Sequence, residues 1–169
     1  MKINLNEIEI LSLEEKDIDD YLKFINQVKS TMEHPEWLGD FSKEELSSLL
    51  NLGSCLYFFK YHGMVVGSSL IIPAREKNIH KFELDIPYEK TMDYGPEGVL
   101  AEARGNGIQL FILQKMDEFS KKLGYKYAVS TVHPDNIFCI RNMEKHGFHY
   151  HQTKDFTRGV RNIYQKDIN

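Results

Sequence analysis

The chain has 169 residues, of which 41% are hydrophobic, 12% aromatic and 27% charged, and its net charge is −4. This length and balance are typical of a soluble globular protein and exclude a disordered or fibrous chain, so we expect a single domain over residues 1–169. The acidic balance disfavours nucleic acid as a partner, because duplex-binding domains neutralise phosphates with excess Lys and Arg, and no apolar run reaches the roughly 20 residues of a membrane helix.

The N-terminal part predicts one strand followed by two helices. Polarity alternates over residues 7–13, as in a strand, and apolar residues then recur at helical spacing over residues 18–32 behind an acidic first turn. Ser42 and Glu45 have the spacing of a capping box, which predicts a second, shorter helix that ends at Gly53.

A hairpin follows, with strands expected at residues 55–61 and 64–73. Aromatic and β-branched residues are frequent in these runs, and His62 and Gly63 between them suit a tight turn because Gly adopts positive φ. Over residues 74–91 the pattern gives way to charged residues and a proline, so we expect this segment to be irregular. It is the longest such segment and therefore a candidate functional loop.

The second half predicts alternating strands and helices and a final hairpin. In chain order, the strands are expected at residues 99–103, 125–132, 148–153 and 158–168, and the helices at residues 108–123 and 136–146. The whole order, βααββ followed by βαβαββ, predicts an α/β (α+β) fold with a mixed sheet and helices on its faces.

The most informative segment is residues 104–109, RGNGIQ, between a short strand and a long helix. Unpaired N–H groups at a helix start attract anions, and glycines let a phosphate approach the backbone without a Cβ in the way, so this turn is suited to a diphosphate. Asn-Gly is also a favoured hairpin turn, but a hairpin needs a return strand, and the residues that follow have helical period. The segment matches neither a P-loop nor a dinucleotide fingerprint.

Two stretches carry a resemblance to a known family. VLAEARGNGIQLFIL, residues 99–113, is similar to motif A of the GNAT superfamily of acyl-CoA-dependent N-acetyltransferases. NIFCIRNMEKHGF, residues 136–148, resembles motif B of the same superfamily. The chain departs from these motifs at two positions, since Gln109 replaces a small residue and Met143 stands where many members carry a tyrosine that serves as general acid.

The resemblance implies the GNAT fold, with a mixed, mostly antiparallel central sheet flanked by helices, and acetyl-CoA as cosubstrate. Backbone groups of Val99 and Leu100 are then expected to hold the pantetheine arm and the thioester carbonyl, and Asn136 and Cys139 of motif B complete the cofactor-binding set. The residues expected around the diphosphate are Arg104, Gly105, Asn106, Gly107, Ile108 and Gln109.

Acetyl transfer to an amine needs a neutral amine, donors for the developing oxyanion and a proton source for the departing thiolate. Family members often place a Glu on the strand before motif A, and the matching position is Asp93, with Glu97 as the other carboxylate within reach. Each of them is alternatively an ordinary solvated carboxylate. Because Met143 cannot donate a proton, Cys139, Tyr94 or a water takes the role of acid, or the thiolate leaves unassisted.

The strand before motif A contains an unusual residue for a paired strand, Pro96. The family's strand separates from its neighbour near this point, which would tolerate a residue without an N–H. The alternative is that residues 95–98, GPEG, form a simple turn.

No metal site is expected. The two cysteines, Cys55 and Cys139, are far apart, which leaves neither a disulfide framework nor paired metal ligands. His149 and His151 alternate onto one strand face, but a partly exposed strand explains them without zinc. Trp37 is either a core anchor or, by the family's arrangement, part of the wall of the acceptor site.

The resemblance implies an acetyl-CoA-dependent N-acetyltransferase that acts by direct transfer on the primary amine of a small molecule, as a monomer or homodimer. The alternatives are a protein or peptide N-acetyltransferase and a catalytically silent CoA-binding sensor domain. The N-terminus lacks the apolar stretch of a signal peptide, so a cytoplasmic location is expected. The sequence does not name the acceptor amine.

Residues 74–91 bear on the choice of acceptor. Their apolar side chains alternate, which is unusual in a solvated loop, and would narrow the acceptor site if the segment folds over it. These side chains are Phe82, Leu84, Ile86 and Tyr88. The same segment is alternatively a neutral insertion, because added loop length costs little free energy.

Overall fold

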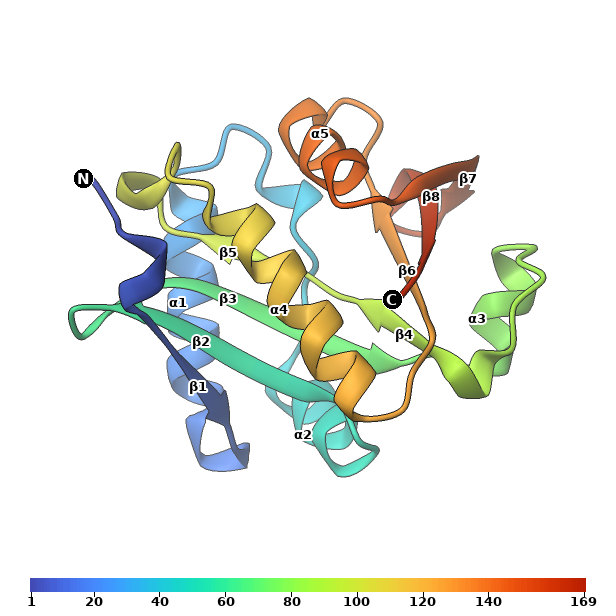
Figure 1. Ribbon diagram of the computed structural model, residues 1–169, viewed down its shortest axis with the longest axis horizontal. Coiled ribbons are helices and arrows are strands. Elements are labelled where there is room, and N and C mark those ends of the chain that lie inside the picture. The colour runs from blue at the N-terminus through green and yellow to red at the C-terminus, as the bar shows by residue number, and fades with distance from the viewer. The chain divides into compact units, whose positions relative to one another are not determined.

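A computed structural model describes all of residues 1–169, which form two compact units. The first unit comprises residues 1–72 and 95–112, and the second comprises residues 73–94 and 113–169. Figure 1 labels the helices and strands of both units. None of the helices is long and apolar enough to cross a membrane.

The first unit contains an antiparallel sheet in the order β1-β2-β3-β5. Its elements are β1 (Ile8–Leu13), α1 (Ile18–Ser30), α2 (Lys43–Asn51), β2 (Cys55–Tyr61), β3 (Met64–Pro73), β5 (Gly98–Val99) and the first turns of α4 (Ile108–Lys122). A side chain added at Gly67 would meet Ile112 of α4, whereas one added at Gly98 would meet Ile25 of α1. Since Gly98 pairs with Ser68, the neighbour of Gly67, α1 and the start of α4 cover opposite faces of this sheet.

The local signals expected in this unit are confirmed. The Ser42 hydroxyl accepts the Glu45 N–H at 3.1 Å and the Glu45 carboxylate accepts the Ser42 N–H at 3.4 Å, which is the reciprocal capping box at the start of α2. His62 and Gly63 have φ of 49° and 84°, so both turn residues between β2 and β3 take the left-handed conformation that a tight hairpin requires.

The chain just before β5 contains a bulge. The Gly95 N–H donates to the Leu70 carbonyl at 2.7 Å, whereas Gly98 pairs with Ser68, so this stretch holds one more residue than the facing stretch of β3. Pro96 lies within the bulge, where its missing N–H removes no ladder bond. The segment 95–98 therefore continues along β3, and the alternative of a simple turn is wrong.

The strand expected at residues 99–103 is shorter than predicted and begins earlier. Its pairing with β3 ends at Leu100, whose N–H donates to the Val66 carbonyl at 2.9 Å. Beyond it, Ala101–Ala103 form a 3-10 turn closed by the Ala103 N–H on the Leu100 carbonyl. The small apolar residues of this segment are compatible with a strand, which is why a longer strand was predicted. In the structure, the 3-10 turn ends the extended backbone.

The second unit contains a mixed sheet in the order β4-β6-β8-β7, with β4 and β6 parallel and the other pairs antiparallel. Its elements are α3 (Glu76–Lys81), β4 (Thr91–Tyr94), the rest of α4, β6 (Tyr127–Val132), α5 (Ile137–Lys145), β7 (His149–Phe156) and β8 (Gly159–Asp167). The strand β4 lies outside the strands expected from the sequence. It pairs Asp93 with Val129, which directs both side chains to one face of the sheet.

Residues 74–90, expected to be irregular, form a compact apolar cluster against that face. The buried members are Ala74, Ile79, Phe82, Leu84, Val129 and Ile163, with Ile86, Tyr88 and Phe156 partly buried beside them. The rings of Phe82 and Phe156 meet edge to face, with 5.8 Å between their centroids. The Gln152 amide of β7 also donates to the Phe82 carbonyl at 2.9 Å. The helix α3 was not predicted, because it is shorter than the window of residues needed to recognise a helical period in a sequence.

Candidate functional site

The predicted site residues are divided between the two units. The first unit holds Glu97, Val99, Leu100 and residues 104–109, and the second holds Asp93, Asn136 and Cys139. These positions are in short strands, at their ends, or at the start of a helix. At helix starts, regular structure leaves backbone N–H groups without partners.

The turn before α4 is open on its outer side. Gly105 and Gly107 have φ of 81° and 76°, a left-handed conformation that residues with a Cβ rarely adopt. A Cβ added at Gly105 would meet no atom within 4 Å, and one at Gly107 would meet only Leu5 Cδ1 at 3.8 Å. Both glycines are exposed, while Ile108, the first residue of α4, is buried and anchors the helix. The turn is therefore exposed and uncrowded on the side to which a Cβ of either glycine would point.

This geometry fits an anionic group such as the diphosphate of coenzyme A. A helix start carries unpaired N–H groups and the positive end of the helix dipole. The first turns of α1 and α2 contain acidic side chains, whereas the first turn of α4 contains none. An incoming phosphate thus meets no side chain of its own charge in the first turn of α4.

The Asn106 side chain fastens the turn to the N-terminal residues. Its Oδ1 accepts the Ile3 N–H at 2.9 Å, and its Nδ2 donates to the Ala103 carbonyl at 2.9 Å and to the Met1 carbonyl at 3.0 Å. These bonds engage both the oxygen and the nitrogen of the Asn106 amide within the protein.

Of the two strand residues expected to hold the pantetheine arm, Val99 presents its backbone and Leu100 does not. The Leu100 N–H donates to the Val66 carbonyl, and the Leu100 carbonyl accepts the Ala103 N–H, each at 2.9 Å. Successive residues of an antiparallel strand direct their N–H and C=O groups to opposite sides. The N–H and C=O of Val99 consequently point away from β3.

Asp93 is a carboxylic acid in an apolar setting. It is half-buried on β4, and its pair partner Val129 belongs to the apolar cluster of residues 74–90. Burial raises the pKa of Asp93 from 3.8 to about 7, because the charged form loses contact with water. A group with this pKa is present in both protonation states at neutral pH, which suits it to accept a proton.

Glu97, the second predicted carboxylate, lies near Tyr21 of α1. Tyr21 is 2% exposed, and burial together with the negative charge of Glu97 raises the pKa of its phenol well above the usual range. The phenol therefore stays neutral at physiological pH. Glu97 and Tyr21 thus place a carboxylate and a neutral hydroxyl on the same unit.

Asn136 and Cys139 are positioned by α5. The Asn136 Oδ1 accepts the Cys139 N–H at 3.4 Å and so caps the helix, and the Cys139 thiol lies 3.8 Å from Met143 Sδ. Met143, at the position where the motif B resemblance would lead one to expect a tyrosine, is 1% exposed. Among these three side chains, only the Cys139 thiol carries a transferable proton.

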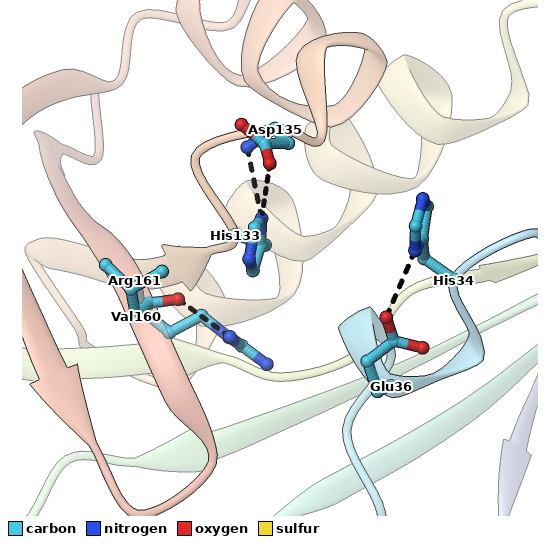
Figure 2. Close-up of polar contacts among 6 residues, drawn as sticks. All are labelled: His34, Glu36, His133, Asp135, Val160 and Arg161. Carbon is cyan, nitrogen blue, oxygen red and sulfur yellow. Dashed lines mark hydrogen bonds and ion pairs between the residues drawn. The ribbon is translucent and has the colours of Figure 1, made fainter.

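The histidines do not gather into a metal site. No group of three or more His, Cys, Asp or Glu side chains could hold a metal ion. His151 Nε2 lies 3.0 Å from the Glu83 carbonyl. His34 Nδ1 lies 3.1 Å from Glu36 Oε1. Figure 2 marks this contact with a dashed line. The His34 ring stacks on Trp37 with 4.3 Å between centroids.

Sequence reasoning missed a charged cluster centred on Asp117 of α4. Its Oδ1 accepts the Tyr94 phenol at 2.6 Å, and its Oδ2 lies 2.8 Å from His146 Nε2 and also binds Lys166 Nζ. Burial alone would raise the pKa of Asp117, but the contacts with His146, Lys166 and Tyr94 lower it. The members come from distant parts of the chain, so no local motif announces them.

No protein-family model matches the sequence, and no curated protein matches it. Solved structures do match it. An acetyltransferase of the GNAT family from Streptococcus pneumoniae has a TM-score of 0.72 and 16% identity, covering 96% of this chain and 100% of that one. yncA from Salmonella typhimurium, solved with its cofactor acetyl-CoA, has a TM-score of 0.71 and 15% identity, covering 97% and 95%. The ribosomal-protein-S18-alanine N-acetyltransferase from Escherichia coli has a TM-score of 0.70 and 14% identity, covering 95% and 94%.

These matches extend over nearly the whole chain, and each of the other chains is also covered almost completely. The chain therefore has the GNAT fold, a mixed α/β architecture of mostly antiparallel strands flanked by helices. The fold class expected from the sequence is confirmed.

Proposed function

We propose that the protein transfers an acetyl group from acetyl-CoA to the primary amine of a small molecule by direct transfer. The observation that carries the proposal is the open glycine turn at the start of α4, in a chain with the GNAT fold. The proposal treats residues 1–169 as one catalytic domain that acts in the cytoplasm, without a metal and as a monomer or homodimer.

Each step of the reaction is assigned to groups of this chain. Acetyl-CoA supplies the activated thioester. The backbone N–H groups of residues 105–109 bind its diphosphate, and the outward backbone of Val99 orients the pantetheine arm. Asp93 accepts a proton from the ammonium form of the acceptor, directly or through a water. The Cys139 thiol gives its proton to the departing thiolate, and the second proton that the acceptor nitrogen loses as the amide forms restores the thiol through water.

The elevated pKa of Asp93 matters because of the acceptor's own chemistry. An alkylamine resembles a Lys side chain, whose ordinary pKa is about 10.4, so nearly all of it is protonated at neutral pH. An ammonium has no lone pair with which to attack a thioester. A carboxylate of pKa about 7 accepts a proton better than one of pKa 3.8 and is still ionised in half of the molecules at pH 7.

One observation favours a second candidate, a CoA-binding sensor without catalysis. Met143 is buried where family members carry an acidic tyrosine, so that side chain supplies no proton. A silent domain would bind acetyl-CoA through the same glycine turn and release no thiol. Turnover separates the two candidates.

The decisive experiment measures binding and turnover on the same preparation. Calorimetry with acetyl-CoA tests the cosubstrate site, and thiol release is followed with a panel of small amines and with peptides bearing free N-termini or lysines. Thiol release that requires a small amine, with mass spectrometry of the acetylated product, supports the proposal. Binding without release supports the sensor, and acetylation of peptides alone supports a protein-modifying enzyme like the Escherichia coli neighbour.

A further inference from the structure

The Asn106 side chain connects the N-terminal segment, residues 1–5, to the glycine turn before α4. Its Oδ1 accepts the Ile3 N–H at 2.9 Å, and its Nδ2 donates to the Met1 carbonyl at 3.0 Å. Met1 and Ile3 are two residues apart, so in an extended chain their backbone groups point to the same side and one amide can bind both. Figure 1 shows this N-terminal end, in blue, near the yellow segment that leads into α4.

The N-terminal segment also packs against the same turn. Ile3 is 8% exposed, although the residues on either side of it, Lys2 and Asn4, are exposed. Leu5 Cδ1 lies 3.8 Å from the position that a Cβ would take at Gly107. Apolar burial and hydrogen bonds thus favour the same docked arrangement of residues 1–5.

Asn106 is the one residue of the turn 105–107 that has a side chain. Gly105 and Gly107, on either side of it, have φ of 81° and 76°. Glycine has more backbone freedom than any other residue, and that freedom is lost when the turn is fixed around a ligand. The Asn106 Nδ2 also donates to the Ala103 carbonyl at 2.9 Å, which fastens the turn to the preceding 3-10 turn. The Asn106 amide therefore supplies a restraint that the two glycines cannot supply.

We infer that Asn106 is a positioning residue that couples the docking of residues 1–5 to cosubstrate binding. The inference rests on the proposed binding of the acetyl-CoA diphosphate by the backbone N–H groups of residues 105–109. While the segment is docked, these groups are held in one arrangement, so less conformational entropy is lost when the diphosphate binds. By linkage, a bound diphosphate favours the docked segment by the same factor. Residues 1–5 thus act as a strap on the turn, and release of the strap weakens the cosubstrate site.

The first test measures acetyl-CoA affinity by calorimetry in Asn106→Ala. We expect about a tenfold loss, because hydrogen bonds of ordinary net strength then no longer hold the turn. The KM for acetyl-CoA should rise by a similar factor while kcat stays nearly unchanged, because the reacting groups are untouched.

Asn6→Ala is the matched control, since it removes the same side chain from an exposed position just beyond the segment, and it should bind acetyl-CoA as wild type does. Thermal unfolding reports whether each variant is folded. An affinity within about twofold of wild type in a folded Asn106→Ala protein overturns the inference.

The second test asks whether Asn106 acts through the N-terminal segment. A chain without residues 2–4, in which Met1 precedes Leu5 directly, lacks the Ile3 N–H and should also lose about tenfold in acetyl-CoA affinity. Adding the deletion to Asn106→Ala should weaken binding no further than Asn106→Ala alone, because either change releases the segment. Losses that multiply, to about 100-fold, would mean that Asn106 acts on the turn without the segment, and they overturn the coupling.

The third test uses the wild-type protein, so it stands even where a variant fails to fold. Saturating acetyl-CoA should slow hydrogen exchange of the Ile3 amide by about tenfold, since the ligand reduces the population of released segment by the coupling factor. The Glu45 amide, which donates to the Ser42 hydroxyl at the start of α2, is the control and should keep its exchange rate. An Ile3 amide that exchanges at the same rate with and without acetyl-CoA overturns the inference.

A failure of the proposed function gives a different result. If coenzyme A binds but no amine releases thiol, acetyl transfer fails, and the affinities and exchange rates measured with coenzyme A still test the coupling. If acetyl-CoA, coenzyme A and inorganic pyrophosphate all fail to bind, the turn is not a diphosphate site and both proposals are overturned. Binding that is the same in wild type, in Asn106→Ala and in the deletion variant overturns the coupling alone.

Discussion

Tyr94 of β4 donates its phenol to Asp117 of α4, with 2.6 Å between the two oxygens. The Tyr94 carbonyl accepts the Ser130 hydroxyl of β6 at 3.1 Å, and its ring meets Phe148 edge to face. Because neighbouring residues of a strand face opposite sides, these contacts hold β4 by one face while Asp93 is presented on the other. The bond between Tyr94 and Asp117 therefore fixes the strand that carries the proposed base.

Asp117→Asn should destabilise the protein in a pH-dependent way. The contacts with His146, Lys166 and Tyr94 lower the pKa of Asp117, so the native state prefers its carboxylate. That stabilisation is present above the ordinary aspartate pKa of about 4 and is lost as pH falls through the lower folded value. We expect the free energy of unfolding at pH 7 to fall by about 1–3 kcal/mol, with the difference from wild type shrinking in acid.

Urea unfolding between pH 7 and pH 3 measures this effect. Glu118→Gln is the matched control, since Glu118 is the next residue of α4, is exposed, and is paired with Lys115 at 3.1 Å. Its loss should change stability by less than about 0.5 kcal/mol. A deficit for Asp117→Asn that stays the same at every pH would contradict the electrostatic account.

Asp93→Asn should slow turnover and stabilise the fold above neutral pH. The pKa of Asp93 is about 7 in the folded protein against 3.8 in a water-exposed chain, so the native state binds more protons between these values. Wild-type stability therefore falls as pH rises from about 4 to about 7, and the asparagine variant avoids this loss. At pH 8 we expect it to be more stable by about 1–3 kcal/mol, with kcat/KM reduced at least about tenfold.

Thermal unfolding and the pH profile of kcat/KM test both parts. Wild type should show a rise in kcat/KM through pH 7, and the asparagine variant should lack it. If Asp93 is the base, the Glu97→Gln variant should keep the rise in kcat/KM through pH 7. Loss of the rise in Glu97→Gln alone would transfer the role to Glu97.

Gly107→Glu should abolish acetyl-CoA binding while the fold survives. The change places a Cβ and a negative charge in front of the α4 N-terminus, where a diphosphate would lie. Gly124→Glu is the matched control for this variant. Gly124 also has a positive φ, of 90°, and open space around its Cβ position, but it follows the other end of α4. Calorimetry should show about a 100-fold or larger loss for Gly107→Glu and little change for Gly124→Glu. Comparable affinities would place the cosubstrate elsewhere.

Sequence reasoning succeeded where the signal is local. The capping box at Ser42 and the turn at His62 and Gly63 depend on neighbouring residues, and both form as expected. Glycine spacing likewise located the turn before α4. The bulge at Pro96 could not be predicted from neighbouring residues, because it depends on how far the chain extends along β3.

The features that the sequence did not predict depend on packing between distant segments of the chain. The elevated pKa of Asp93 comes from burial, and composition gives no hint of that burial. The partners of Asp117 are likewise distributed along the chain. Packing between distant segments therefore decides the charge state of the titratable groups in the second unit.

Residues 74–90 pack against the sheet face that carries Asp93. Phe82 is 8% exposed and belongs to the apolar cluster that includes Val129, the pair partner of Asp93. Phe82→Ala should lower the free energy of unfolding by about 3 kcal/mol, because it leaves a cavity in that cluster. It should also admit water to the face that carries Asp93. Since burial is what raises the pKa of Asp93, the rise in kcat/KM should then move from about pH 7 toward lower pH.

Leu123→Ala is the control for this variant, since Leu123 is 54% exposed in the same unit and its truncation should change neither stability nor the pH profile. Acetyl-CoA affinity should be preserved in both variants, because the glycine turn belongs to the first unit. An acceptor KM that rises severalfold in Phe82→Ala alone would identify residues 74–90 as a wall of the acceptor site. A destabilised Phe82→Ala protein with the wild-type pH profile and acceptor KM would mean that the segment stabilises the sheet and has no part in the reaction.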